Sequence, residues 1–485
     1  MSYFQNRRDS IRTKTVLQRR DYLKDRGVKT QSHRLRNLLS SLSLAAVVSG
    51  YTLPSAAMAA DTSTAAQGPL SDFGNALAAK GLYLYASNFN EVFDTVSGGL
   101  KHGTLGGGQA DFSTIFDLGK IADIPNAALQ MSLDYQYGSL ARMTGSDTGA
   151  SLIPSGIQGP GIGDAGTVRL AELSYSQSFL NDRIWFLVGR SQSTWFFNIV
   201  PMLLQFESIN VDLGSPTFVF NSNGAGYGEA NWGGLIRVRP TQSTYLKVGV
   251  YEDNRDNAEA NYHGFPGTDW SLKGANGVLV PVQMGISVHP AGLSGTYALG
   301  GYYDSSYYGG NLYGNTQRRG RTGVYIHATQ QIWAPTQGSA RGLYLFGEAS
   351  WATSGVNIVN NAFAGGVIES GPFNARPNDS AGILFTSNSF GGTAESDLAN
   401  ASEKAGYKGW KNRPEYEFEA EYSFNLGHGL SFRPFVQHIW NPDQVFVSNP
   451  NPSDRSATVV GANFGVVFNG LLGLPVFQSP GDFRP

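Results

Sequence analysis

Short segments of alternating hydrophobic and polar residues recur along this chain. In residues 129–137, Leu129, Met131, Leu133, Tyr135 and Tyr137 occupy alternate positions. Successive side chains of a β-strand point to opposite faces, so this segment predicts a strand with one apolar face. Helical periodicity is weak except at residues 70–80, where a short helix is expected before Gly81. The pattern predicts an all-β protein.

Most predicted strands form pairs joined by short turns. Asn181 and Asp182 are typical of one such hairpin turn. The predicted strands are 82–86, 129–137, 169–179, 183–190, 234–239, 244–251, 280–289, 295–304, 324–333, 342–351, 415–424, 430–440 and 457–468; long stretches rich in Gly, Ser, Asn and Pro lie at 141–166, 198–231, 252–277, 304–322, 353–411 and 441–456. Short turns at one end and long loops at the other are typical of an outer-membrane barrel. A soluble β-sandwich remains an alternative on the strand pattern alone.

The clearest alternation lies at residues 415–424. Four glutamates share one face of this predicted strand and aromatic residues fill the other: the glutamates are Glu415, Glu417, Glu419 and Glu421. Neighbouring carboxylates would stand ~6.8 Å apart along the strand. A helix would instead set like charges four residues apart, which is unfavourable. We expect one face to be aqueous and the other to contact lipid.

Composition narrows the class of protein. Only 15% of the 485 residues are charged and no cysteine is present, whereas soluble domains carry about 25% charged residues. The absence of cysteine excludes disulfides, thiolate metal sites and a cysteine nucleophile. From Ala60 onward the chain has 24 basic and 34 acidic residues. This acidic balance disfavours a nucleic-acid partner.

The first 59 residues have the order of a secretory signal peptide. Residues 1–37 hold eleven Lys or Arg and three Asp or Glu, an apolar run follows at 38–53, and Ala57-Met58-Ala59 offers a cleavage site. An N-terminal membrane anchor is the alternative, but serines interrupt the run and it is short for a span. We expect residues 60–81 to form a periplasmic leader with a short helix, residues 82–468 the barrel, and residues 469–485 a C-terminal extension.

Aromatic residues support a membrane barrel over a soluble sandwich. The eight tryptophans lie mostly at or just beyond the ends of predicted strands, and transmembrane barrels carry aromatic girdles at both interfaces. No apolar run after residue 51 is long enough for a spanning helix. We therefore predict a transmembrane antiparallel up-and-down β-barrel of about 16 strands, with 18 possible, short periplasmic turns and long extracellular loops.

Several segments resemble the carbohydrate-selective porins of Gram-negative outer membranes (OprB-type). The resemblance is carried by residues 70–74 and 77–81, 90–99, the hairpin 170–190 (LAELSYSQSFLNDRIWFLVGR), 237–241 with 245–251, 342–348, and 433–437 through 441–442. It extends over about residues 69–468. Phe73 and Asn75 depart from the opening motif, and the chain continues past Phe468, the expected last residue of the final strand. The resemblance implies a single barrel with a charged constriction that passes monosaccharides by diffusion.

Candidate pore-lining residues follow from taking the non-apolar face of each strand. They are Glu172, Arg237, Arg239, Tyr245, Lys247, Tyr325, His327, Glu348, Glu415, Glu417, Glu419, Glu421 and Arg433. Carboxylate, guanidinium and hydroxyl groups supply both kinds of hydrogen-bond partner that sugar hydroxyls need. Charged residues lining a pore also filter solutes by sign. Each could equally be a solvated wall residue. We expect Arg237, Arg239 or Arg433 to face the glutamate row.

Other functions are weighed against a sugar channel. A general porin, an adhesin and an enzyme on a barrel remain alternatives. Glu417 and Glu419 could be the two carboxylates of a glycosidase. However, they point the same way from one strand, whereas a glycosidase pair flanks the glycosidic bond. No Gly-x-Ser-x-Gly or His-Glu-x-x-His motif is present, and no cofactor or metal is expected. The partners expected are outer-membrane lipid and small neutral carbohydrates, with the chain a monomer or a trimer. Stretches 141–166 and 353–411 are the candidates for a constricting loop.

Overall fold

The computed structural model describes residues 68–138, 147–150, 167–208, 214–222, 230–253, 272, 275–309, 317–445 and 447–478. All of these belong to one compact unit, Ala46–Pro485. The predicted signal peptide, residues 1–59, and most of the predicted leader lie outside the described residues. Within the described part, no helix is long and apolar enough to cross a membrane.

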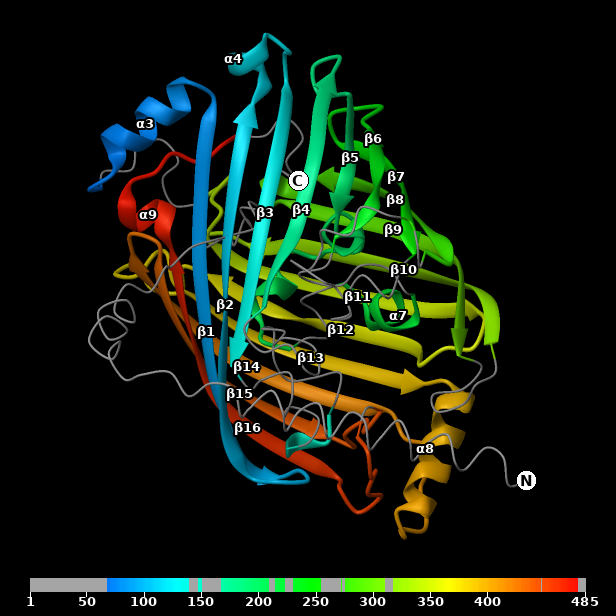
Figure 1. Ribbon diagram of the computed structural model, residues 1–485. Coiled ribbons are helices and arrows are strands. Elements are labelled where there is room, and N and C mark those ends of the chain that lie inside the picture. The colour runs from blue at the N-terminus through cyan, green and yellow to red at the C-terminus, as the bar shows by residue number, and fades with distance from the viewer. Residues whose placement is uncertain are drawn as a thin grey trace, which may run out of the picture. The chain divides into compact units, whose positions relative to one another are not determined.

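Sixteen strands form one closed antiparallel barrel (Figure 1), which confirms the predicted fold class. Each strand pairs with its neighbours in sequence, and β1 pairs with β16 to close the sheet. The strands are β1 (Leu82–Gly98), β2 (Gly103–Asp117), β3 (Ala127–Gly138), β4 (Thr167–Phe179), β5 (Ile184–Ser191), β6 (Asn231–Val238), β7 (Thr244–Asp253), β8 (Gly277–Val288), β9 (Gly295–Gly309), β10 (Gln317–Trp333), β11 (Gly342–Ser354), β12 (Val359–Ser370), β13 (Ser380–Phe390), β14 (Glu415–Gly427), β15 (Leu430–Trp440) and β16 (Ser456–Val467). Closure leaves no unpaired edge, as a lipid environment requires.

Three strands were missed from the sequence. β2 was not predicted, and the stretch 353–411, predicted to be loop, contains β12, β13 and α8 (Gly392–Lys404). β2 carries Gly106, Gly107 and Gly108, and β12 carries Gly365 and Gly366. Glycine and polar residues obscure the alternation and have low β-propensity. Pairing with neighbouring strands overrides that propensity here.

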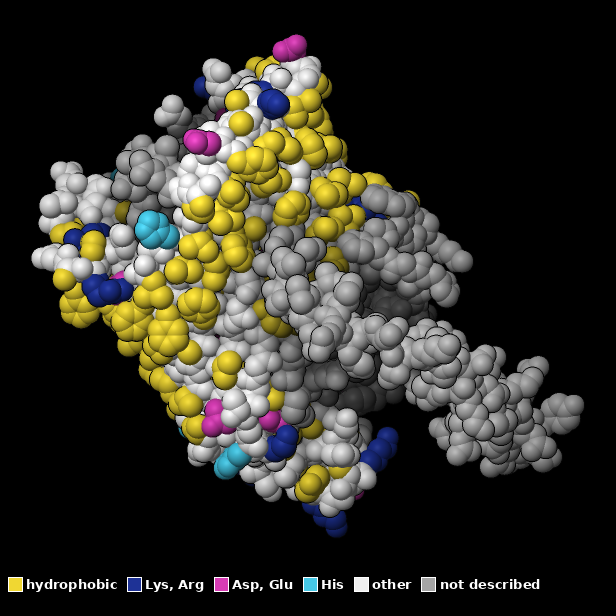
Figure 2. Space-filling model, turned by 60° about the vertical axis from the view of Figure 1, so that its left-hand side comes forward, with side chains coloured by type: hydrophobic (Ala, Val, Ile, Leu, Met, Phe, Trp, Pro, Cys, Tyr) yellow, Lys and Arg dark blue, Asp and Glu magenta, His cyan; other side chains and the backbone are white. Residues whose placement is uncertain are grey.

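The alternation separates an outer apolar face from an inner polar one. On β10, Val324 and Ile326 are 40% and 46% exposed, whereas Tyr325 between them is fully buried. On β14, all four glutamates are buried on the inner side and the aromatic residues alternate with them. Apolar side chains form a continuous band across the outer surface in Figure 2. This band matches the lipid-facing belt of a transmembrane barrel.

The first and last described segments pack together at the short-turn end. Helix α3 (Ser71–Ala79) precedes β1, and α9 (Phe468–Leu472) follows β16. Phe468 therefore begins a helix, whereas the sequence predicted that it ends the last strand. The Asn469 side chain accepts a hydrogen bond from Ala86 N at 3.0 Å and donates to Leu84 O at 2.8 Å. These bonds continue the contact between β16 and β1 beyond the last strand pair.

Five of the described tryptophans fall into two groups. Trp333, Trp351 and Trp440 lie at or near strand ends and are 53%, 44% and 41% exposed on the outer surface, as expected for residues at a membrane interface. Trp185 and Trp195 instead belong to an apolar cluster inside the barrel. Strand-end position alone therefore does not assign a tryptophan to the outer surface.

The remaining short elements are α4 (Leu118–Ala122), η1 (Ser193–Trp195), η2 (Leu203–Gln205), α7 (Pro216–Asn221) and η4 (Pro290–Gly292).

Candidate functional site

The connection between β5 and β6 folds into the barrel. Its described residues, 192–208 and 214–222, are called the inward loop below, and contain η1, η2 and α7. Hydrogen bonds join it to inner-facing residues of β7, β8, β14, β15 and β16. The prediction of a constricting loop in 353–411 is wrong, because that stretch forms wall strands and α8. Most of 141–166 lies outside the described residues.

Apolar side chains hold the inward loop against the wall. Phe196, Phe197 and Phe218 are buried in a cluster with residues of β5 to β9. Leu203 and Phe206, with Val200, pack on residues of β11 to β13. Burying one such side chain stabilises by roughly 1.5–3 kcal/mol. The run WFFNIVPMLLQF at 195–206 is the sequence signal that could have identified this loop, because the other long connections are polar.

The first part of the loop is held by donor and acceptor groups of β7 and β8, called the β7–β8 latch. Lys247 Nζ donates a hydrogen bond to Phe196 O. Gln283 Oε1 accepts one from Asn198 N at 2.8 Å, and Gln283 Nε2 donates to the Tyr245 hydroxyl at 2.6 Å. Lys247 and Gln283 are 3% and 2% exposed. These polar groups therefore satisfy the loop backbone where it leaves β5.

The glutamate row of β14 holds the far part of the loop, and with Arg433 forms the β14–β15 latch. Glu419 accepts hydrogen bonds from the backbone N–H groups of Glu207 at 2.8 Å and Ser208 at 3.1 Å. Glu417 accepts one from Ser208 Oγ at 2.6 Å. Buried carboxylates are costly unless they are hydrogen-bonded. These two carboxylates satisfy loop groups, and both oxygens of Glu419 are satisfied in return.

Arg433 completes this latch with positive charge. Its Nε lies 3.2 Å from Glu207 Oε1, and its Nη1 donates to Gln205 O. Asn463 donates to the other Glu207 oxygen at 3.3 Å, and the Gln205 side chain donates to Glu421. Burial raises the pKa of the Glu207 carboxyl above its usual range, although Arg433 and Asn463 oppose that shift. The cation thus stands beside both the loop carboxylate and the strand glutamates.

The fourth glutamate of the row has a different role. Glu415 accepts a hydrogen bond from Asp443 N at 2.7 Å and one from Asn388 Nδ2 at 3.4 Å. Asp443 belongs to the connection between β15 and β16. Glu415 therefore anchors that connection, and the row as a whole serves two different loops.

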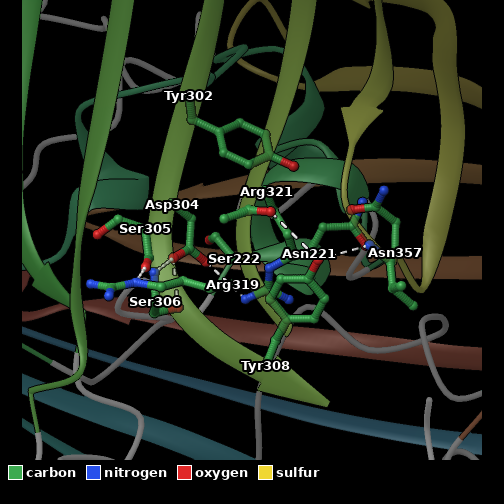
Figure 3. A network of polar contacts seen from close by, with 12 residues as sticks. Asn221, Ser222, Tyr302, Asp304, Ser305, Ser306, Tyr308, Arg319, Arg321 and Asn357 are labelled. Carbon is green, nitrogen blue, oxygen red and sulfur yellow. Dashed lines mark hydrogen bonds and ion pairs between the residues drawn. The ribbon is translucent and has the colours of Figure 1, made fainter. Parts of the chain in front are cut away.

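Helix α7 docks the end of the inward loop on β10 to β12 (Figure 3). Asn221 Oδ1 accepts hydrogen bonds from Ile358 N and Val359 N, both at 3.0 Å, and its Nδ2 donates to Val359 O at 2.6 Å. The Tyr302 hydroxyl donates to Thr217 O at 2.6 Å. One side chain thus meets three backbone groups at the start of β12. The docking of α7 is consequently specified by backbone geometry as well as by apolar packing.

An ion pair lies next to α7 in the same view. Arg321 Nη2 is 2.8 Å from Asp304 Oδ2, and both side chains are nearly inaccessible. Asp304 also accepts from Ser306, and the Arg321 guanidinium stacks over the Tyr308 ring at 4.3 Å. Breaking such a buried pair costs about 3–5 kcal/mol, because it leaves an uncompensated charge.

The candidate residues divide among several places on the inner wall. Arg237 and Arg239 bind Asp182 at the turn between β4 and β5, at 2.8 Å and 2.5 Å. They do not face the glutamate row, so of the three arginines considered only Arg433 lies beside it. Glu172 accepts hydrogen bonds from Ser174 and Gln130.

Two further candidates lie side by side on β10 and β11. His327 is in register with Glu348, and the rings of Tyr325 and His327 are stacked at 6.3 Å. The Tyr325 hydroxyl donates to Gln283 at 3.1 Å, which links it to the β7–β8 latch. Direct contact between sugar and any of the thirteen candidates stays a prediction.

Sequence reasoning missed several residues of the latches. Gln283, Gln437 and Asn463 are inward-facing amides on predicted strands, and the same alternation that selected the charged residues could have selected them. Gln437 Nε2 donates to Glu419 at 3.1 Å. Gln205 and Ser208 lie outside any regular element that the sequence predicted. Among the described residues, no group of three or more His, Asp or Glu could hold a metal ion.

Comparison with known proteins identifies relatives of this chain. The family model "Carbohydrate-selective porin, OprB family" matches residues 101–468. Porin B of Pseudomonas aeruginosa is 26% identical over 303 residues, which cover 58% of this chain and 65% of that protein, slightly under two thirds of its length. A putative porin of Acinetobacter baylyi, QuiX, is 22% identical over 367 residues, covering 70% of this chain and 82% of that protein.

Solved structures with the same fold are also found. The high-pH structure of Pseudomonas putida OprB superimposes with a TM-score of 0.72 at 22% identity, covering 84% of this chain and all of that one. The low-pH structure of the same protein gives a TM-score of 0.52 at 18% identity, covering 83% and 97%. At these identities the likeness shows the fold.

Proposed function

Because the chain belongs to the OprB family of carbohydrate-selective porins, we propose that it lets monosaccharides and similar neutral carbohydrates diffuse across the outer membrane. The observation that carries this proposal is the inward loop, which narrows a closed barrel with an apolar outside and a polar inside. The channel route lies in the space that the inward loop leaves inside the barrel. Family and fold indicate a channel rather than an enzyme.

The polar groups on the inner wall suit a diffusing sugar. Hydroxyl groups of a sugar donate and accept hydrogen bonds, and carboxylate, amide and guanidinium groups offer both kinds of partner. A channel solute must leave as readily as it enters, so weak contacts spread along the wall serve passage better than one tight site. Fixed latches keep the width of the channel constant while solutes pass.

Charge supports a preference for neutral over anionic solutes. Among the buried charged side chains of the described residues, acidic ones outnumber basic ones. A carboxylate-rich wall disfavours anions of the same size by electrostatic repulsion. We therefore expect anionic sugars to pass more slowly than neutral ones.

Liposome swelling with size-matched neutral, cationic and anionic solutes tests the proposal. The expected order for proteoliposomes is neutral sugar above anionic sugar, with empty liposomes as the control. Equal rates for all three would reduce the protein to a general porin, and no swelling with any solute would contradict a channel. Export through a cleaved signal peptide is a separate part of the proposal, and N-terminal sequencing of the mature protein near Ala60 tests it.

A further inference from the structure

A cleft lies at the end of the barrel that carries α8, opposite α3 and α9 (Figure 1). Its lining residues come from α8, from residues 410–413 before β14, and from residues 441–444 and 452–455 between β15 and β16. It holds about 370 Å³ of space, which includes open solvent at its mouth. The cleft is therefore shallow, and a small solute reaches it from outside the barrel.

Trp410 forms a fixed aromatic surface in this cleft. Its half-buried ring is part of the lining. The indole N–H donates a hydrogen bond to Glu395 Oε2 at 3.0 Å, and the ring packs against the apolar cluster that contains Phe390 and Leu398. The hydrogen bond and the packing together hold the ring in one orientation. A ring held in this way offers a flat apolar surface on which the C–H groups of a sugar ring stack.

Hydrogen bonds join the two connections that form the cleft. Asn441 Nδ2 donates to Pro414 O at 3.1 Å, and Asn441 N donates to Arg455 O at 2.8 Å. Asp443 N donates to Glu415, on the inner face of β14, at 2.7 Å. The cleft is thus held in shape by backbone and side-chain contacts, and it adjoins the inner wall of the barrel.

Charged side chains of both signs line the cleft. The formal charges of the lining residues cancel, because three are basic and three are acidic: Lys411, Arg413 and Arg455, and Glu395, Asp443 and Asp454. Lys411 and Arg455 are exposed, and Asp454 is half-buried. The cleft therefore offers both donors and acceptors without a large excess of either charge. A neutral solute with several hydroxyl groups matches this combination, because each hydroxyl both donates and accepts.

We propose that this cleft binds one face of a neutral monosaccharide at the mouth of the channel, before the solute meets the inward loop. The proposal rests on the proposed function, since it supposes that sugars are the solutes of the channel. The C–H face of the sugar stacks on Trp410, while its hydroxyl groups accept hydrogen bonds from Lys411 and Arg455 and donate to Asp454. An open cleft with few contacts binds weakly, so the solute is released into the channel.

Titration of the detergent-solubilised protein with glucose, followed by tryptophan fluorescence, tests the cleft, because Trp410 lies at the proposed site. We expect a saturable change in the wild type, and we expect Trp410→Phe to remove it. The test variant is Lys411→Met with Arg455→Met, which keeps two long side chains and removes two charged donors. Its half-saturation concentration should rise about tenfold, since two hydrogen bonds to the sugar are lost.

The matched control is Lys408→Met with Arg318→Met. It makes the same chemical changes at exposed positions outside the cleft, and it should titrate as the wild type does. A fluorescence change that persists in Trp410→Phe overturns the cleft as the binding site. An unchanged half-saturation concentration in the assembled test variant overturns it as well. If the test variant fails to assemble, Arg455→Met alone replaces it, and the Trp410→Phe comparison remains decisive.

Two further measurements separate the parts of the proposal. Tighter binding of glucose 6-phosphate or of glucosamine than of glucose overturns the preference for a neutral solute. Liposomes that swell in glucose, with no saturable fluorescence change, overturn the cleft and leave the proposed function intact. Saturable binding at the cleft without any swelling supports the cleft and contradicts the proposed function.

Discussion

Two inner walls of this barrel carry the same kind of side chain and use it differently. On β14, Glu417 and Glu419 accept hydrogen bonds from the backbone and side chain of the inward loop. On β3, Asp134 lies in register with Asp111 and Arg169 on the two neighbouring strands, and so pairs within the wall. Both walls show polar residues at alternate positions, so both have the same pattern in the sequence. The difference shows that alternation assigns a residue to the inner face, whereas its partner depends on what lies across the barrel.

The side chains of the two walls also contribute differently to stability. A buried carboxylate that meets two N–H groups stabilises the docked loop, and its loss leaves those groups unpaired at about 1–3 kcal/mol each. On β3, the charge of Arg169 offsets the repulsion between Asp134 and Asp111, and no part of the inward loop depends on that offset. We therefore expect substitutions on β14 and β15, rather than substitutions on β3, to act on channel width.

The largest effect is expected from Arg433→Ala. The substitution removes the ion pair with Glu207 and the hydrogen bond to Gln205 O, and leaves a buried carboxylate without its cation. Breaking such a pair costs about 3–5 kcal/mol, which should release the far part of the inward loop. Single-channel conductance should rise, and limited proteolysis should cut the loop. The control is Arg183→Ala at an exposed turn; wild-type conductance in an assembled Arg433 variant would contradict the latch.

A smaller effect is expected from Glu419→Gln. The amide keeps the shape and one acceptor oxygen, but it loses the charge that strengthens the bonds from Glu207 N and Ser208 N. Hydrogen bonds to charged groups contribute about 1.5–3 kcal/mol. Conductance should rise less than for Arg433→Ala. Glu369→Gln on β12, outside the latches, is the matched control. An equal rise in conductance for this control would contradict the role of Glu419 in holding the inward loop.

The smallest effect is expected at the contact between the chain ends. The rings of Tyr83 and Phe477 lie 5.1 Å apart, and aromatic pairs contribute about 0.5–1.5 kcal/mol beyond the area they bury. Phe477→Ala should lower the temperature at which the folded barrel converts to its heat-denatured gel band, while conductance stays as in wild type. Phe373→Ala, at a turn where the ring is 58% exposed, should leave that temperature unchanged. A conductance change in the Phe477 variant would show that the chain ends also influence the channel.

Much of the fold could be predicted from local pattern. The hairpins around Asn181 and around residues 426–429 follow from strand alternation and turn chemistry, and both are present. β12 could not be found in this way, because Gly365 and Gly366 interrupt its apolar face. Of the three arginines expected as alternatives beside the glutamates, Arg433 lies there, whereas Arg237 and Arg239 pair with Asp182 at a turn. The residue type alone did not predict which acidic residue each arginine pairs with.

The sequence by itself determined which side of each strand faces lipid, since that depends only on the alternation of neighbouring residues. It also determined that the glutamates at 415, 417, 419 and 421 share the inner face. Only the tertiary structure decided that the loop after β5 enters the barrel and that three of these glutamates hold it there. Glu207 and Glu419 are 212 positions apart in the chain. Contacts over that separation arise from closure of the barrel, which no local periodicity encodes.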